Sequence, residues 1–379
     1  MRRATLVVVA LVAALATSLF VSSAGAQTSA PVLPAAAWYL VGPDGDVLAR
    51  HDAGDARAIA SITKLMTAVV VLENAKLDDV VRVSPEAARV GESTVYLRAG
   101  EDLTVAELLR ATLVPSANDA AEALALHVGG GSADRFVELM NAKAKRLGLS
   151  DTHFENPHGL DQQGHVSSAR DVTTLVRYAL GIPFIHDALS RTSLTLPGGR
   201  TFETTDDLLS SWSPLVAGKT GHTRDAGWSQ TAAAARGGTT VYGAVLGSES
   251  RSMRNDALRT LLTYGLDQYR AVSIVDGSRV YGTIPTGYGQ PDVELVAPRA
   301  ISRSIRVGRP LVQRVVAPTS LALPVAKGAR LGRVEVYDGA RLVAASPLVA
   351  AAAVADASFF AKATWYVTRT VHNLWSLVT

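Results

Sequence analysis

Apolar residues recur along this chain at two different spacings, and these predict where helices and strands lie. A spacing of three and four residues is typical of a helix with one buried face. It occurs over residues 61–74, 104–113, 117–128, 132–147, 168–180 and 253–269. Strand-like runs around short Gly-containing turns predict two hairpins, 37–41 with 47–50 and 228–235 with 239–246. This order predicts an α+β domain over residues 35–270, with an antiparallel sheet flanked by helices.

The pattern changes after residue 270. Short β-like runs, separated by Gly and Pro, occur at 272–274, 293–296, 304–307, 311–316 and 333–337. Such runs predict a small β-sandwich, which we place at residues 271–350. The charge also indicates a second domain, because residues 27–270 carry a net charge of about −5 and residues 271–350 about +5.

The N-terminal residues are typical of an export signal. Arg2 and Arg3 precede an apolar run over residues 6–20, and the small residues Ala24-Gly25-Ala26 follow. These are the three parts of a secretory signal peptide. We therefore expect residues 1–26 to be removed, residues 27–34 to form a lead-in, and the mature protein to work outside the cytoplasm. A retained membrane anchor is the alternative, which the short run disfavours.

The C-terminal residues 351–379 predict a contact with the membrane surface. Apolar and aromatic residues, among them Phe359, Phe360 and Trp375, recur there at steps of three and four, and Lys362 falls between them. An amphipathic helix with aromatic residues and a cationic polar face suits the plane of a membrane interface. We expect it to lie peripherally on the outer face of the cell membrane. A helix docked on its own domain is the alternative.

The composition excludes several classes of protein. The 379 residues include no cysteine, which excludes disulfides, thiolate metal sites, a cysteine nucleophile and a lipoprotein anchor. The formal net charge of +3 gives no support for a nucleic-acid partner. The eight histidines form no His-Glu-x-x-His pattern, which argues against a zinc peptidase. We expect no metal and no cofactor.

The first candidate for catalysis is the segment Ser61-Ile62-Thr63-Lys64. Residues three apart share a face of a helix, so the Ser61 hydroxyl and the Lys64 amine can come within hydrogen-bonding reach. A serine nucleophile needs a partner that takes its proton, and a neutral lysine can serve. Taken alone, the motif is better explained by Ser61 as a helix cap. The buried face of the helix would consist of Ile62, Leu65, Met66, Val69 and Val70.

Two later segments add groups that a serine enzyme can use. Ser116-Ala117-Asn118 lies in a loop before a helix and places a hydroxyl beside an amide, although a helix cap would also explain it. Gly218-Lys219-Thr220-Gly221 is typical of a strand edge with a cation, a hydroxyl and glycines that let a substrate backbone approach. A phosphate-binding P-loop does not fit, because the upstream Gly of that pattern is absent.

Together and in this order, the three motifs resemble those of active-serine penicillin-binding proteins and class A β-lactamases. Within that group the chain resembles the low-molecular-mass penicillin-binding proteins that are D-alanyl-D-alanine carboxypeptidases. The resemblance runs from about residue 35 to the C-terminus. It includes Asn156-Pro157-His158-Gly159-Leu160-Asp161 and Ser168-Ala169-Arg170-Asp171, while Ala117 stands where a Gly is more usual.

The resemblance implies a serine-type D-Ala-D-Ala carboxypeptidase with a penicillin-binding fold. Ser61 would attack the carbonyl of the penultimate D-Ala of a peptidoglycan stem peptide, with Lys64 as the candidate base, and water would then hydrolyse the acyl-enzyme. Ser116, Asn118 and Lys219 would orient groups and relay protons. β-Lactam antibiotics would acylate the same serine.

The resemblance also implies which groups bind the substrate. The backbone N–H groups of Ser61 and His222 would form the oxyanion hole. The substrate-binding residues would be Thr220, Gly221, His222, Thr223 and Arg254, of which Thr220, Thr223 and Arg254 would hold the terminal carboxylate. For Arg254, a surface position on a helix is the simpler interpretation.

Two other functions stay open on the sequence alone. A class A-like β-lactamase is one, because Glu155 lies between the second and third motifs, where those enzymes carry a deacylating glutamate. A catalytically inactive wall-binding scaffold is the other, although all motif residues are present. The additional β domain and C-terminal helix favour the carboxypeptidase over a diffusible β-lactamase.

Overall fold

The chain divides into two compact units. The structure is a computed structural model that describes residues 12–19 and 29–375. Among these, residues 29–268 form one unit, and residues 269–375 together with 12–19 form the other. The boundary follows directly after helix α8 (Arg251–Asp267).

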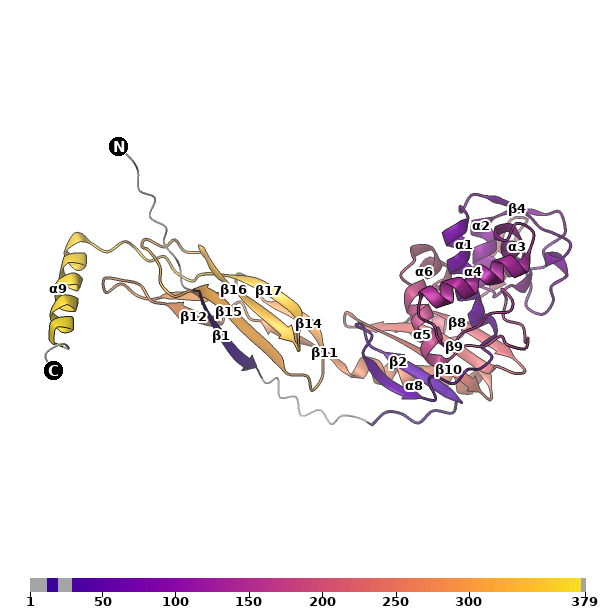
Figure 1. Ribbon diagram of the computed structural model, residues 1–379, viewed down its shortest axis with the longest axis horizontal. Helices are drawn as coiled ribbons and strands as arrows, with labels where there is room; N and C mark the ends of the chain where they lie inside the picture. The colour runs from indigo at the N-terminus through magenta and orange to yellow at the C-terminus, as the bar shows by residue number, and fades with distance from the viewer. Residues whose placement is uncertain (1–11, 20–28, 376–379) are drawn as a thin grey trace. The chain divides into compact units, whose positions relative to one another are not determined.

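A five-stranded sheet forms the centre of the first unit (Figure 1). Its order is β3-β2-β10-β9-β8, and all neighbouring strands are antiparallel. The strands are β2 (Ala37–Val41), β3 (Val47–His51), β8 (Leu215–Thr223), β9 (Gly227–Arg236) and β10 (Thr239–Ser248). Both predicted hairpins, β2 with β3 and β9 with β10, are confirmed. Strand β8, which contains the third motif, is an edge strand of this sheet.

Helices cover both faces of this sheet, as predicted. Besides α8 they are α1 (Lys64–Asn74), α2 (Val105–Leu113), α3 (Asn118–Val128), α4 (Ala133–Arg146), α5 (Ala169–Ala179), α6 (Pro183–Leu189) and α7 (Leu208–Ser211). Thr231 of β9 donates to a carbonyl of α5, whereas a Cβ added at Gly243 of β10 would meet Leu262 of α8. Gly243 pairs with Ala232, the neighbour of Thr231. Because successive strand residues point to opposite faces, α5 and α8 cover opposite faces of the sheet.

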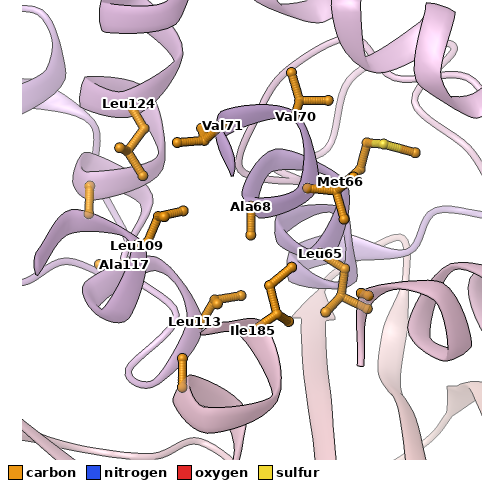
Figure 2. Packing of buried hydrophobic residues seen from close by; sticks show 14 of the residues in the cluster. Leu65, Met66, Ala68, Val70, Val71, Leu109, Leu113, Ala117, Leu124 and Ile185 are labelled. Atoms are coloured by element: carbon orange, nitrogen blue, oxygen red, sulfur yellow. The ribbon is translucent and has the colours of Figure 1, made fainter. Parts of the chain in front are cut away.

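Helix α1 lies inside the helical layer. Its residues 64–71 are all buried. Figure 2 shows its apolar side chains among those of neighbouring helices such as Leu109 of α2, Leu124 of α3 and Ile185 of α6. The prediction of a single buried face is therefore too narrow, because a helix that is apolar all round is enclosed on all sides. This enclosure holds Lys64, the first residue of α1, in a fixed position.

Smaller elements of this unit escape the sequence patterns. Two short hairpins join β4 (Val80–Arg82) with β5 (Asp102–Thr104), and β6 (Ser193–Leu196) with β7 (Arg200–Glu203). Two 3-10 turns are η1 (Ala60–Thr63) and η2 (Ala87–Arg89). Runs of three or four residues are too short for a period to be recognised.

The second unit is rich in β-structure, as predicted. A six-stranded sheet has the order β1-β15-β16-β17-β13-β12, and β11 pairs with β14. The strands are β11 (Tyr269–Val275), β12 (Val280–Ile284), β13 (Val293–Val296), β14 (Ile301–Arg306), β15 (Leu311–Pro318), β16 (Arg330–Asp338) and β17 (Arg341–Ala350). Their buried residues, such as Leu295, Val334 and Leu348, form a separate core. The sequence missed β12 and β17; β17 pairs on both sides, yet it carries apolar residues on both faces and contains Pro347, which argues against a central strand.

Part of the predicted signal peptide has a defined place. Val12–Leu19 form strand β1, which is antiparallel to β15. The other residues of that segment, 1–11 and 20–26, lie outside the described residues, as do residues 27–28 of the lead-in. Cleavage before Gln27 stays a prediction, and it would remove β1 and leave β15 at the end of the sheet.

Helix α9 (Phe359–Trp375) follows the second sheet. The Tyr288 ring lies 5.2 Å from that of Trp365 and 5.9 Å from that of Tyr366, between ring centroids. Phe359 and Phe360 are 80% and 81% exposed. The helix therefore contacts its own unit and also presents apolar side chains to solvent. Within the described residues, no helix has the length and apolar content that crossing a membrane would need.

Candidate active site

Ser61 lies in the tight turn that leads into α1. It belongs to η1, and Lys64 begins the helix. Positions three apart eclipse each other in a 3-10 turn, and Lys64 Nζ lies 2.7 Å from Ser61 Oγ. The residues at the N-caps of η1 and α1 are Ile59 and Thr63. The interpretation of Ser61 as a helix cap is therefore wrong, and its hydroxyl is free to contact the amine.

The Lys64 amine has three hydrogen-bond partners. Besides Ser61 Oγ, Nζ contacts Asn118 Oδ1 at 2.6 Å and the His158 carbonyl at 2.9 Å. Asn118 Nδ2 donates to the Gly91 carbonyl at 2.9 Å, so its Oδ1 faces the lysine. The Asn118 and His158 oxygens can only accept, whereas the serine hydroxyl can donate. A neutral amine gives its two protons to those two oxygens, and its lone pair then faces the Ser61 hydroxyl.

Burial favours the neutral form of both lysines. Burial, and then the positive charge of Lys219, lower the pKa of Lys64 well below its ordinary value, while Asp119 and Glu92 oppose the shift. Burial also lowers the pKa of Lys219 to about 7. The site therefore contains a base next to the serine and a second amine that titrates near neutral pH.

Ser116 and Lys219 form a second hydrogen-bonded pair. Lys219 Nζ donates to Ser116 Oγ at 2.8 Å and to the Thr220 carbonyl at 3.1 Å. The N-cap of α3 is Ala117, so the interpretation of Ser116 as a cap is also wrong. Ser116 has a left-handed φ of 67°, a conformation that is costly for non-glycine residues and is concentrated at functional sites.

Strand β8 carries the third motif past the turn that holds Ser61. A Cβ added at Gly221 would lie 2.6 Å from the Ile59 carbonyl oxygen and 3.2 Å from the Ser61 nitrogen. Only a glycine lets the two backbones approach this closely. His222, the next residue, has an exposed side chain that stacks on Trp228 with ring centroids 4.0 Å apart.

A cavity of about 330 Å³ lies beside Ser61. It is lined by Ser61, Ser93, Ser116, Thr204, Thr205, Thr220, Gly221, His222, Trp228, Arg251 and Arg254. The lining does not include Lys64, Asn118 or Lys219, which are each at most 2% exposed. Lys64 contacts Ser61, Asn118 contacts Lys64, and Lys219 contacts Ser116. Most residues of the cavity wall therefore carry hydroxyl, imidazole or guanidinium groups, and the buried amines contact Ser61 and Ser116 of this wall.

Arg254 lines this cavity and is not a surface residue. It is only 1% exposed, its guanidinium lies 3.3 Å from the Asp207 carboxylate, and it sits 5.8 Å from the centroid of the Trp228 ring. The interpretation as a surface arginine is therefore wrong. Thr223 was expected to bind the substrate, but it does not line the cavity. Its hydroxyl donates to Asp161 Oδ1 at 2.6 Å.

Sequence reasoning missed several residues of the cavity. Ser93, Thr204, Thr205, Trp228 and Arg251 line it, and Thr205 shares a hydrogen bond of 2.6 Å with the hydroxyl of Thr220. None of them belongs to a motif with a recognisable spacing. The consecutive threonines before Asp206-Asp207 were the one available signal.

The candidate for a deacylating glutamate lies elsewhere. The Glu155 carboxylate is 3.1 Å from His153 Nε2, and Glu155 is not among the residues that line the cavity. The segment after Glu155 contributes a backbone group to the site, because the His158 carbonyl accepts a hydrogen bond from Lys64 Nζ. Among the residues that the structure describes, no cluster of His, Asp or Glu could hold a metal ion.

An α+β domain in which a buried lysine faces a serine hydroxyl at a polar cavity defines a serine acyl-transfer enzyme of the penicillin-binding type. Comparison with known families agrees. The model of the family described as D-alanyl-D-alanine carboxypeptidase matches residues 24–250, and that of the penicillin-binding protein 5 C-terminal domain matches residues 269–356. The chain belongs to the D-alanyl-D-alanine carboxypeptidase family, whose activity is of the serine type, as the sequence motifs predicted.

Individual relatives cover most of the chain. It is 33% identical to D-alanyl-D-alanine carboxypeptidase DacD of Salmonella typhimurium over 359 residues, which are 89% of this chain and 90% of the relative. The solved structure of penicillin-binding protein 5 from Haemophilus influenzae has a TM-score of 0.63 at 26% identity, covering 87% of this chain and all of that one. A penicillin-binding protein homologue from Mycobacterium tuberculosis has a TM-score of 0.61 at 31% identity, covering 64% of this chain and 95% of that one. Both predicted domains therefore have counterparts in solved structures.

Proposed function

We propose that this chain removes the terminal D-Ala from peptidoglycan stem pentapeptides through an acyl-enzyme on Ser61. The observation that carries this proposal is the surrounding of Lys64 Nζ, which lies 2.7 Å from Ser61 Oγ and has two further partners that can only accept. The pKa of this buried amine is well below its ordinary value, so it can act as a general base.

In acylation, Ser61 Oγ attacks the carbonyl carbon of the penultimate D-Ala and its proton passes to Lys64. The backbone N–H groups of Ser61 and His222 stabilise the oxyanion that forms. When the C–N bond breaks, the leaving nitrogen takes a proton from Ser116, which is hydrogen-bonded to Lys219. The proton that Lys64 took from Ser61 then replaces the proton that the pair of Ser116 and Lys219 gave to the leaving nitrogen. Asn118 keeps the Lys64 amine oriented throughout.

In deacylation, water attacks the ester carbonyl carbon and gives a proton to the base. The C–O bond to Ser61 breaks, its Oγ recovers a proton, and the shortened peptide leaves. A penicillin would follow the first step only, because its opened ring stays attached and blocks the approach of water.

The polar cavity suits the carboxylate at the end of the substrate. Arg254 and Thr220 line it and supply a positive charge and a hydroxyl donor, and Arg251 adds a second guanidinium. Gly221 leaves room for the substrate backbone beside β8. We assign Thr220, Gly221, His222 and Arg254 to substrate binding, with Thr223 acting at most through its bond to Asp161.

Two substrates and one variant test this proposal. The purified protein is incubated with a labelled penicillin and with a peptide that ends in D-Ala-D-Ala. We expect a long-lived acyl-enzyme and released D-Ala, and Ser61→Ala should lower both by at least about 10⁴-fold. Rapid turnover of the penicillin would indicate a β-lactamase, and absence of acylation in the parent protein would indicate a scaffold.

We also propose that the chain is exported, loses residues 1–26 and binds the outer face of the cell membrane through α9. The exposed Phe359 and Phe360 at the start of α9 support this, since aromatic side chains of a basic amphipathic helix insert at the interface. In co-sedimentation with phosphatidylglycerol vesicles, Phe359→Ser/Phe360→Ser should lose most binding. Leu342→Ser, which removes an exposed apolar side chain from β17, is the control. Equal binding of the two variants would contradict the proposal.

A further inference from the structure

A buried carboxyl lies one helical turn beyond Asn118. Glu122 is the fourth residue after Asn118 on α3, and its side chain is only 7% exposed. Its Oε2 lies 3.7 Å from Nε2 of His158, whose side chain is 12% exposed. The reaction described above uses neither side chain. It does use the His158 carbonyl, which accepts from Lys64 Nζ at 2.9 Å.

The proton of the His158 ring faces Glu122. The Leu160 N–H donates to Nδ1 of His158 at 3.3 Å, so Nδ1 carries no proton and the ring proton is on Nε2. Burial, then the nearby Lys64, lower the pKa of His158 to about 3, so the ring is neutral. At 3.7 Å the Nε2–H points toward a carboxyl oxygen beyond normal hydrogen-bond length, and the attraction is electrostatic.

The backbone on either side of the His158 carbonyl is held by other bonds. Thr67 donates to the Pro157 carbonyl at 2.5 Å, and the Gly159 N–H donates to Asn156 Oδ1 at 2.7 Å. The peptide between these two anchors can still tilt about them. The buried side chain of His158 is a further element that restrains this tilt, and Glu122 is the group that its Nε2 faces.

We propose that Glu122 is a positioning residue: by holding the His158 ring, it keeps the His158 carbonyl against Lys64 and so directs the amine's lone pair toward Ser61. This inference rests on the proposed role of Lys64 as the base. Without the His158 carbonyl, one N–H of the neutral amine has no fixed acceptor, and the lone pair can turn away from the serine hydroxyl.

Charges from several elements surround the pair. Burial raises the pKa of Glu122 to about 7, and Glu86 beside η2 and Asp134 of α4 add to this. On the other side, Lys64 of α1 and His165 face His158. Glu122 therefore changes charge near neutral pH. Both of its forms keep an oxygen that can face Nε2, so holding the ring does not require the negative charge.

Three variants test the inference by single-turnover acylation with a labelled penicillin. Glu122→Ala should lower the acylation rate constant about 10-fold while the dissociation constant of the initial penicillin complex stays within about 2-fold. Glu122→Gln keeps an acceptor oxygen and should retain the rate within about 3-fold at neutral pH. Glu138→Ala, an exposed carboxylate on α4, is the matched control and should behave like the parent protein.

A spectroscopic readout separates this inference from the proposed function. In ¹⁵N NMR of the full chain, His158 should be a neutral ring protonated on Nε2 in the parent protein and in Glu122→Gln. The Leu160 N–H keeps Nδ1 unprotonated in all variants, so in Glu122→Ala the tautomer should stay while the Nε2 resonance shifts and its proton exchanges faster with solvent. An unchanged Nε2 resonance or an unchanged acylation rate in Glu122→Ala would overturn the inference, as would equal changes in the Ala and Gln variants. If the parent protein is not acylated at all, the proposed function fails, while the Nε2 resonance still decides whether Glu122 holds His158.

Discussion

The contact between Gly159 and the turn that carries Ser61 gives the sharpest test of how the site is assembled. Gly159 has a left-handed φ of 89°, and a Cβ added there would lie 2.0 Å from the Ala60 carbonyl oxygen and 2.9 Å from Thr63 Oγ1. Two backbone segments meet at this point, so no side chain can rotate away to relieve the overlap. Gly159→Ala should therefore push the loop off the turn.

Gly164 provides a matched control. Its φ is 90°, close to that of Gly159, but an added Cβ would meet Glu155 Oε1 at 2.8 Å, which is the mobile end of a side chain. The left-handed conformation costs an alanine roughly 1 kcal/mol at either position. At Gly159 the overlap requires a backbone displacement of about 1 Å, and overpacking of this kind adds roughly 1–3 kcal/mol.

These magnitudes translate into melting temperatures and rates. With about 2–4 °C lost per kcal/mol in a domain of this size, Gly164→Ala should melt about 2–4 °C lower and Gly159→Ala roughly 5–15 °C lower. Because the displaced loop carries the His158 carbonyl away from Lys64, Gly159→Ala should also acylate with penicillin at least about 10-fold more slowly, whereas Gly164→Ala keeps its rate. If the two variants melt together and acylate equally, the loop does not position the turn and the reasoning is refuted.

Three further predictions concern the cavity, the buried amine and the core. Thr220→Val should lower carboxypeptidase turnover by about 10-fold and Thr223→Val by less than about 3-fold, because only the first hydroxyl lines the cavity; the reverse order would contradict the assignment. Burial lowers the pKa of Lys219 to about 7, so between pH 7 and the unfolded pKa near 10.5 the unfolded chain binds more protons, and stability rises with pH by up to about 1.4 kcal/mol per unit. Lys219→Met should reduce the slope of stability against pH by this amount in urea denaturation, while the buried Lys64 keeps its own contribution; an unchanged slope would show that Lys219 is charged in the folded protein. Leu109→Ala should cost about 2–5 kcal/mol and Leu139→Ala, at a 36% exposed position on α4, less than about 1 kcal/mol in the same assay; equal costs would contradict the described core.

Long periodic segments made most of the fold predictable. The helices from α1 to α5 and α8 and the two hairpins of the central sheet carry enough residues for a period to show, and their order limits the possible layers. The sequence could not reveal that α1 is enclosed on all sides. The buried residues outside the predicted stripe include Thr67, Ala68 and Val71, and the burial of each depends on packing partners elsewhere in the chain.

The candidate site was predictable where chemistry needs a fixed spacing. Ser61 and Lys64 share one turn, so their contact follows from local geometry. The groups that complete the surroundings of Lys64 come from positions 54 and 94 residues further along the chain. The His158 contribution is a backbone carbonyl, which every residue possesses and no sequence pattern can mark. The burial of Arg254 was missed for a related reason, since its partner Asp207 lies on a different element.

The enclosure of α1 also has a consequence for measurements of local opening. A helix buried over residues 64–71 offers its amide protons to solvent only when the whole domain opens, so these amides belong to the slowest class in hydrogen exchange. The amine of Lys64 therefore stays in place for as long as the domain remains folded. Substitutions in α1 will alter turnover and the half-life of the folded chain together, and activity screens alone will not separate the two.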